Sequence, residues 1–287
     1  MQQNSLSVSI VIPVYNEAQE LAACLDAVAR QSVAPYEVVV VDNNSTDDST
    51  AIARSYDFVK LVREPKQGVV YARSTGFNAA TGEIIARIDA DTTVPTDWVS
   101  TVQSLFEDVT LDAVSGSAEY TNVACSTFFN GVDLFFRRRL ERQLKNRVYL
   151  WGSNMAMRRS AWQQVEPVLC NRAGIHEDFD IAIHLQELGG RVAFAQELQA
   201  QVSSRRIDVD FVSFIKYALV SPNTYAQHRI KQRIYMYEVV AVCILGYVPA
   251  RLLHRGYDPV RQQFSVTQLL FCRPTSVARP DPTVHVA

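Results

Sequence analysis

The chain lacks several features that would assign it to a specialised class of protein. Its formal net charge is only −2, so no overall basic field points to nucleic acid as a partner. The first residues carry no basic segment, and the apolar run at 10–14 is too short for a secretory signal. Residues 239–250 are uncharged, but a membrane-spanning helix needs about 20 residues. We therefore expect no transmembrane segment.

The cysteines do not form a recognisable disulfide or metal framework. There are 5, an odd number without a C-x-x-C pair: Cys24, Cys125, Cys170, Cys243 and Cys272. This usage is typical of reduced, mostly buried thiols. We therefore predict a cytoplasmic location, with peripheral attachment to the inner face of the cell membrane as the alternative.

The composition is that of an ordinary folded protein. The 287 residues are 48% hydrophobic and 20% charged, which is enough for one large domain with an appendage. Prolines accumulate after residue 272 while apolar residues become scarce, which predicts a disordered tail. We expect an α/β domain at 1–208, a helical appendage at 209–272 and a tail at 273–287.

β-Branched runs alternate with helical patterns from the start of the chain. Strands are predicted at 7–14, 37–41, 59–62, 83–89 and 113–120, with amphipathic helices between them. Asn16 and Gln19 are expected to cap the first helix. This alternation predicts an α/β fold with a mainly parallel central sheet flanked by helices.

Two acids follow an apolar run in the fourth of these strands. Asp89 and Asp91 follow the run at 84–88, and Pro95 stops the strand. Their side chains point to the same side, at the carboxyl end of a buried strand, where open α/β sheets bind ligands. Two such carboxylates can hold a divalent cation and, through it, a substrate phosphate. The same spacing recurs without a preceding apolar strand at Asp178/Asp180 and Asp208/Asp210.

Six motifs, in order, resemble those of family 2 glycosyltransferases. These enzymes have the GT-A fold and move a sugar from a nucleotide diphosphate to an acceptor with inversion. Any one motif is weak, but their order over roughly residues 7–205 is specific. The motifs lie at 12–17, 40–47, Gly68 with 72–73, 88–91, 152–159 and 176–180.

The resemblance implies a donor site that holds a nucleotide-diphosphate sugar, with UDP as the expected nucleotide. Asp42 would accept a hydrogen bond from the pyrimidine N–H, and Arg73 would lie near the base and diphosphate. Asp91, with Asp89, would bind Mn²⁺ or Mg²⁺. The donor-binding residues implied are Pro13, Tyr15, Glu17, Asp42, Arg73, Asp89 and Ala90. From the residues alone, Asp42 could instead cap a helix, and Arg73 could pair with Asp42 or Asp89.

The resemblance also implies a catalytic base and an acceptor wall. Asp178 would take the proton from the acceptor hydroxyl, and Glu177 would orient the acceptor or share that role. Trp151, Gly152 and Asn154 would form the acceptor side. The alternative for Glu177 and Asp178 is that a helix N-terminus simply attracts acids.

The chain also departs from the family pattern. Lys66-Gln67-Gly68 stands where Asn-x-Gly is common, Ser74 replaces an asparagine, and residues 201–205 lack the histidine that can reach the metal. The Gln-x-x-Arg-Trp motif of processive members is absent, so we expect one sugar per catalytic cycle.

Two stretches combine aromatic and basic residues. They lie at 128–147 and 211–253. Each stretch could form a helix that packs on the domain and exposes its basic face to solvent. Alternatively, each could contact a membrane surface, which would suit a lipid-linked or cell-envelope acceptor.

Two rival functions remain open. Asp89-Ala90-Asp91-Thr92-Thr93 also resembles the Asp-x-Asp-x-Thr motif of haloacid-dehalogenase-type phosphatases, in which the first aspartate is phosphorylated. The other rival is a non-catalytic nucleotide-sugar-binding protein. A nicotinamide dehydrogenase is disfavoured, because no G-x-G-x-x-G follows the first strand.

Overall fold

The computed structural model describes residues 5–120, 126–144, 147–170, 172, 174–202, 208–258 and 263–267. The predicted tail at 273–287 lies outside the described residues, and so do residues 203–205 of the segment in which a histidine ligand was sought.

The centre of the fold is an eight-stranded sheet with the order β3-β2-β1-β4-β7-β6-β8-β5. Strands β5 and β7 run antiparallel to their neighbours, and the other strands share one direction, which confirms the mainly parallel sheet. The strands are β1 (Val8–Val14), β2 (Glu37–Asp42), β3 (Val59–Arg63), β4 (Ile84–Ile88), β5 (Thr92–Thr93), β6 (Ala113–Tyr120), β7 (Asn154–Arg158) and β8 (Val192–Val202).

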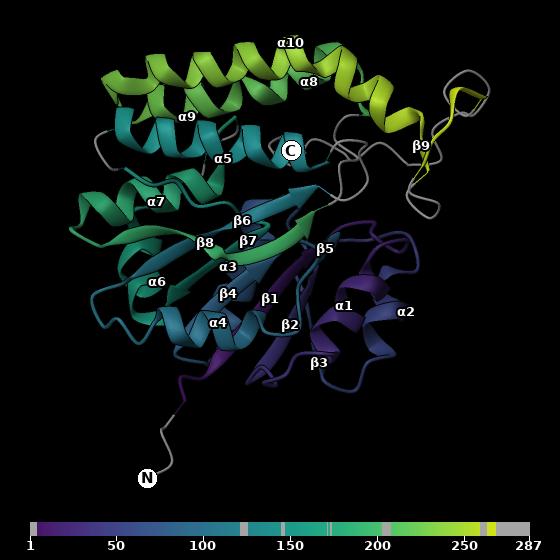
Figure 1. The fold of residues 1–287 in the computed structure, drawn as a ribbon. Coiled ribbons are helices and arrows are strands. Elements are labelled where there is room, and N and C mark those ends of the chain that lie inside the picture. Colours follow the sequence, from purple (N-terminus) through teal and green to yellow (C-terminus); the bar gives the residue numbers. More distant parts are fainter. Residues whose placement is uncertain are drawn as a thin grey trace.

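Helices cover both faces of this sheet (Figure 1). One core contains side chains of α1 (Leu21–Ala29), α2 (Ser49–Arg54) and α4 (Trp98–Leu105). The other contains side chains of α3 (Val69–Ala79), α6 (Arg159–Val165) and α7 (Glu177–Glu187). Successive residues of β1 enter opposite cores, Ile10 one and Val11 the other, as strand geometry requires. This explains why the inner strands are apolar throughout rather than alternating.

The predicted cap of the first helix is wrong. Helix α1 begins at Leu21 after Glu20, and no side chain caps it. Asn16 instead has a left-handed backbone (φ 54°), and its Oδ1 accepts the Thr46 N–H at 2.8 Å. The asparagine therefore joins the loop after β1 to the loop after β2 rather than starting a helix.

The C-terminal part packs through a third core. This part comprises α8 (Phe211–Ala218), α9 (Val220–Gln227), η3 (Lys231–Tyr235), α10 (Met236–Arg255), β9 (Tyr257–Asp258) and β10 (Gln263–Phe264). Helix α5 (Ser126–Gln143) packs against it, and the short η1 (Glu166–Val168) lies between α6 and α7. Leu140 of α5, Ile183 of α7, Tyr225 of α9 and Met236 share this core. Figure 1 shows α10 farthest from the sheet, with α5 between it and the strands.

Helix α10 is longer than the uncharged stretch from which its length was judged. Within the described residues, Lys231–Arg255 is the one helical segment long and apolar enough to cross a membrane, and only 22% of its apolar window is buried. The expectation that no segment has sufficient length was therefore wrong. Length and composition do not by themselves distinguish a spanning helix from one that packs on a soluble domain.

Candidate functional site

Three carboxylates, those of Glu17, Asp89 and Asp91, follow the ends of β1 and β4. Burial raises the pKa of the Cys24 thiol on α1, and the charges of Asp91, Asp89 and Glu17 raise it further. The Cys24 thiol also donates a hydrogen bond to the Asp89 carbonyl at 3.7 Å. The charges of Glu17 and of the two predicted metal ligands thus act on one thiol. Carboxylates such as those of Asp89 and Asp91 are the hard oxygen ligands that Mg²⁺ and Mn²⁺ prefer.

The loop that carries Glu17 is fastened to the loop after β2. The Glu17 N–H donates to Ser49 Oγ at 2.8 Å, and the Ala18 N–H donates to Asp47 Oδ2 at 3.0 Å. Tyr15 lies half-buried on this loop, and Pro13 lies in β1 opposite Val41. The loop is therefore positioned by side chains of the neighbouring strand-to-helix connection.

Asp42 closes β2 and is buried. Its Oδ1 accepts the Ser45 N–H at 3.0 Å, whereas Asp47 Oδ1 accepts the Ser49 N–H at the start of α2. The alternative of a helix cap therefore applies to Asp47 and not to Asp42. The next residue, Asn43, accepts the Gly68 N–H at 2.8 Å. Gly68 has a φ of 135°, which glycine adopts readily, so this bond sets the entry to α3.

Arg87 links the two predicted acidic motifs, and the sequence analysis missed it. Its guanidinium is buried in β4, with Nη2 3.1 Å from Asp89 Oδ1 and Nη1 2.9 Å from Glu177 Oε1. A buried charge requires such partners. The signal was present in Ile84-Ile85-Ala86-Arg87-Ile88, because an arginine inside an apolar strand must find carboxylates nearby.

Asp178 and Glu177 begin α7 but have different electrostatic surroundings. Burial raises the pKa of Asp178, Glu177 raises it further, and the value reaches about 7. Burial also acts to raise the pKa of Glu177, but Arg87 and then Arg73 outweigh it and lower the pKa. Two adjacent carboxyls are thus separated into an ionised anchor and a stronger base.

Gly152 lies against Asp178 and Arg87. Its N–H donates to Asp178 Oδ2 at 2.8 Å. A Cβ at this position would lie 2.7 Å from the Arg87 guanidinium carbon, so a larger residue would have to displace Arg87. The missing side chain of Gly152 therefore leaves room for the Arg87 guanidinium.

Arg73 is buried on α3, and it is not paired with Asp42 or Asp89 among the described residues. Its guanidinium lies 5.1 Å from the Trp162 ring, and its Nε and Nη1 have no hydrogen-bond partner. Burial lowers the pKa of Arg73 to about 10, and the charge of Glu177 opposes this shift. The charge of Glu177 thus acts on Arg73, while the direct ion pair of Glu177 is with Arg87.

The expected acceptor residues divide into two groups. Asn154 is buried, and its amide accepts from Trp98 Nε1 at 3.0 Å while donating to the carbonyls of Ser117 and Leu198. Trp151 is half-buried, and the Arg137 guanidinium lies 4.7 Å from its ring. Arg137 is itself buried, so this member of the basic stretch faces inward rather than solvent.

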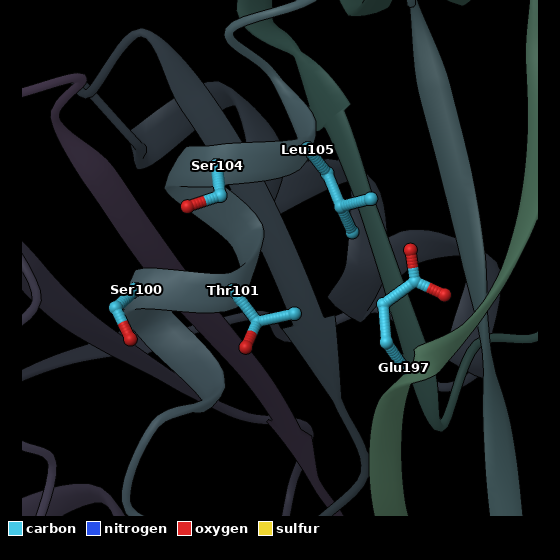
Figure 2. Close-up of a pocket in the computed structure, with 5 residues that line it drawn as sticks. All are labelled: Ser100, Thr101, Ser104, Leu105 and Glu197. Carbon is cyan, nitrogen blue, oxygen red and sulfur yellow. The ribbon is translucent and has the colours of Figure 1, made fainter.

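A separate hollow lies between α4 and β8. Figure 2 shows it lined by Ser100, Thr101, Ser104, Leu105 and Glu197. None of the residues predicted for the site lines it. Ala90, between the two predicted metal ligands, is buried in the core under α1 and α4.

Known proteins that are similar in sequence to this chain are named as glycosyltransferases. The glycosyltransferase AglE of Haloferax volcanii is 33% identical over 167 residues, 56% of this chain and 55% of that protein. A PGL/p-HBAD biosynthesis glycosyltransferase of Mycobacterium bovis is 39% identical over 88 residues, 29% of this chain and 34% of that protein. The matched stretch thus spans about half or less of these relatives.

Solved structures share the fold. The mannosyltransferase PcManGT of Pyrobaculum calidifontis, in complex with GDP-Man and Mn²⁺, matches with a TM-score of 0.64 and 21% identity, covering 88% of this chain and 74% of that one. Residues 1–349 of S. aureus TarS, in complex with UDP-GlcNAc, match with a TM-score of 0.59 and 17% identity, covering 88% and 80%. The fold is therefore of the GT-A type. The profile of Glycosyl transferase family 2 matches residues 9–165, more than half of the chain, and the chain belongs to that family.

Proposed function

We propose that this chain transfers one sugar from a nucleoside-diphosphate sugar to an acceptor hydroxyl, with inversion and with the help of a divalent cation. The observation that carries the proposal is the Arg87 bridge from Asp89 to Glu177, which joins the donor acids to the start of α7. Family membership and a neighbour bound to GDP-Man and Mn²⁺ support it. The phosphatase alternative fits neither the family nor the engagement of Asp89 by Arg87.

The donor would lie at the carboxyl ends of β1, β2 and β4. Asp42 offers an acceptor for the base, while Pro13, Tyr15 and Glu17 belong to the loop beside it. Bound by Asp91 and Asp89, Mn²⁺ or Mg²⁺ would neutralise the diphosphate as it leaves. Arg73 is buried with two unsatisfied nitrogens, which suits either a diphosphate or the nearby Glu177.

Asp178 is the proposed base. Its carboxylate would accept the proton of the acceptor hydroxyl while that oxygen attacks the anomeric carbon on the face opposite the diphosphate. A single displacement of this kind inverts the anomeric centre. Gly152 fixes Asp178 through its N–H, Arg87 keeps Glu177 ionised, and Trp151 offers an aromatic wall to the acceptor. We reassign Asn154 to the packing of β7, because its amide is engaged within the protein.

The first test is a calorimetric titration with UDP, GDP, CDP and dTDP, each with and without Mn²⁺. Metal-dependent binding of one nucleotide is expected, with UDP tried first. Asp97 is exposed directly before α4 and provides a control, because Asp97→Asn should bind like the wild type. Failure to bind any nucleotide diphosphate would overturn the proposal. The anomeric configuration of the product, read by NMR, then tests inversion.

We also propose peripheral contact with a membrane through the outer face of α10. Leu245, Val248 and Leu252 are exposed there, and the exposed Lys231 and Arg233 precede the helix in η3. An apolar helix face beside basic residues is typical of interfacial binding. Flotation with anionic liposomes should carry the wild type upward and leave Leu245→Gln/Val248→Gln at the bottom. Leu188→Gln, an exposed leucine at the end of α7, is the matched control.

A further inference from the structure

A second cluster of metal-binding side chains lies behind α7. It comprises Cys170, Asp180, His184 and His228, which are four residues from three separate segments. Each offers one ligand atom, and these atoms all lie within 4.8 Å of one another. The loop after η1 provides Cys170, α7 provides Asp180 and His184 one turn apart, and the end of α9 provides His228.

Two distances within the cluster are those expected of a tetrahedral zinc site. Bonds of about 2.0–2.3 Å place neighbouring ligand atoms about 3.3–3.6 Å apart. Cys170 Sγ lies 3.5 Å from His184 Nε2, and His184 Nε2 lies 3.6 Å from Asp180 Oδ1. His228 Nε2 lies closer to Asp180 Oδ1, at 2.8 Å, which is a hydrogen-bond distance. A small rotation of the side chains would let both atoms bind a metal in place of this hydrogen bond.

The groups around the cluster orient its ligands. Asp180 Oδ2 accepts the backbone N–H of Cys170 at 2.8 Å, so the other oxygen, Oδ1, faces the two histidines. His184 Nδ1 lies 3.3 Å from Glu187 Oε2. Metal-bound histidines commonly donate their second ring nitrogen to a carboxylate in this way, which leaves the first nitrogen as the ligand. With Nδ1 protonated, the lone pair of His184 Nε2 faces a carboxylate and a sulfur. A Zn²⁺ in place of the Cys170 thiol proton would bind all three of these groups.

We propose that Cys170, Asp180, His184 and His228 bind one Zn²⁺ that fastens α9 to α7. One thiolate and two imidazoles select zinc over Mg²⁺ or Mn²⁺, which prefer oxygen ligands. Four protein ligands leave no open position, so the zinc is structural rather than catalytic. Helix α7 begins with Glu177 and Asp178, and the zinc would secure the helix that carries them. This site is separate from the cation site at Asp89 and Asp91.

The test measures zinc directly, so it is independent of sugar transfer. The untagged chain, purified without chelators, should contain one zinc per chain. After exchange with Co²⁺ it should show a thiolate-to-cobalt charge-transfer band and the strong visible bands of tetrahedral cobalt. Cys170→Ser should lose the charge-transfer band. His228→Gln should lower zinc affinity at least about 100-fold, because it removes a ligand and not merely a group that supports one.

Matched controls separate zinc binding from general damage. Cys243→Ser changes an exposed cysteine of α10, and His254→Gln changes a histidine 3.2 Å from Asp208. Both should keep full zinc content, and so should Asp91→Ala, even if the proposed donor site fails. Zinc should also protect Cys170 of the wild type from alkylation, a readout that needs no variant. A wild-type chain that takes up only substoichiometric zinc, or equal alkylation of Cys170 with and without zinc, would overturn the proposal.

Discussion

The carboxylates at the end of β4 and the cluster behind α7 both suit a cation, but they differ in composition and closure. Asp89 and Asp91 offer only oxygens, and they lie at the sheet edge where a substrate can supply further ligands. The cluster of Cys170, Asp180 and two histidines offers sulfur, nitrogen and oxygen, and as the proposed zinc site it would supply all four ligands from the protein. A metal with an incomplete set of protein ligands has open positions at which a substrate can bind. A metal with four protein ligands has no open position, so its role is to hold segments of the chain together.

The strongest expected contrast comes from Asp91→Ala. Removing a carboxylate from the oxygen site should abolish Mn²⁺-dependent nucleotide binding and reduce turnover by at least about 10³-fold, because the leaving diphosphate loses its counter-charge. Zinc content should not change. Calorimetry and metal analysis on the same preparation check both points, and Mn²⁺-dependent binding that persists would place the cation elsewhere.

Asp178→Asn separates chemistry from binding at the start of α7. We expect kcat to fall about 10²–10⁴-fold, because asparagine cannot accept the acceptor proton. Donor affinity and zinc content should match the wild type. If donor affinity instead fell as far as in Asp91→Ala, Asp178 would belong to the donor site and not act as the base.

Arg87→Met tests the link between the donor acids and α7. We expect the free energy of unfolding to fall by about 3–5 kcal/mol, because Glu177 is left as a buried charge without its main partner. Urea denaturation measures this loss. The double variant Arg87→Met/Glu177→Gln should recover a large part of the stability, and a double variant as unstable as the single one would show that Arg87 acts through packing alone.

Removal of zinc should lower the thermal stability of the protein strongly and should change its affinity for the donor nucleotide only a little. A zinc-selective chelator should lower the thermal midpoint of the wild type, because a ligand that binds only the folded state stabilises it by mass action. His228→Gln should melt near the chelated wild type and respond little to the chelator. Mn²⁺-dependent nucleotide affinity should stay nearly constant, and a parallel loss of both would indicate that the two regions are not independent.

The smallest expected effect concerns an acid distant from both regions. Burial alone would raise the pKa of Glu37, but hydrogen bonds from Thr81 and Ser9 and the charge of Lys60 lower it below its usual 4.5. The folded state therefore binds fewer protons than the unfolded state. This stabilisation is present above the unfolded pKa and is lost as the pH falls through the folded pKa.

Glu37→Gln isolates that contribution. At pH 7 the urea midpoint of the wild type should be higher than that of the variant. The difference between the two midpoints should become smaller near pH 3. A gap that is the same at both values would show that the bonds of Glu37 do not depend on its charge.

Local sequence patterns predicted the strands of the central sheet and the acids at the end of β4 well. Apolar runs such as 37–41 became strands, because a strand buried on both faces must be apolar throughout. The motif at Asp89 and Asp91 was predicted from its position after a buried strand, and the structure places it at the end of β4. Asn16 was misassigned because its partner, Thr46, lies in another loop.

The sequence by itself determined the family, the α/β alternation and the acids at the end of β4, since each depends on residues near one another in the chain. Only the tertiary structure revealed the Arg87 bridge, the inward position of Arg137 and the cluster of Cys170 with His228. Those groups come from segments far apart in sequence, and neither hydrophobic periodicity nor residue spacing predicts that they are in contact. Their proximity follows from how α5, α7 and α9 pack over the sheet, which burial of apolar faces decides.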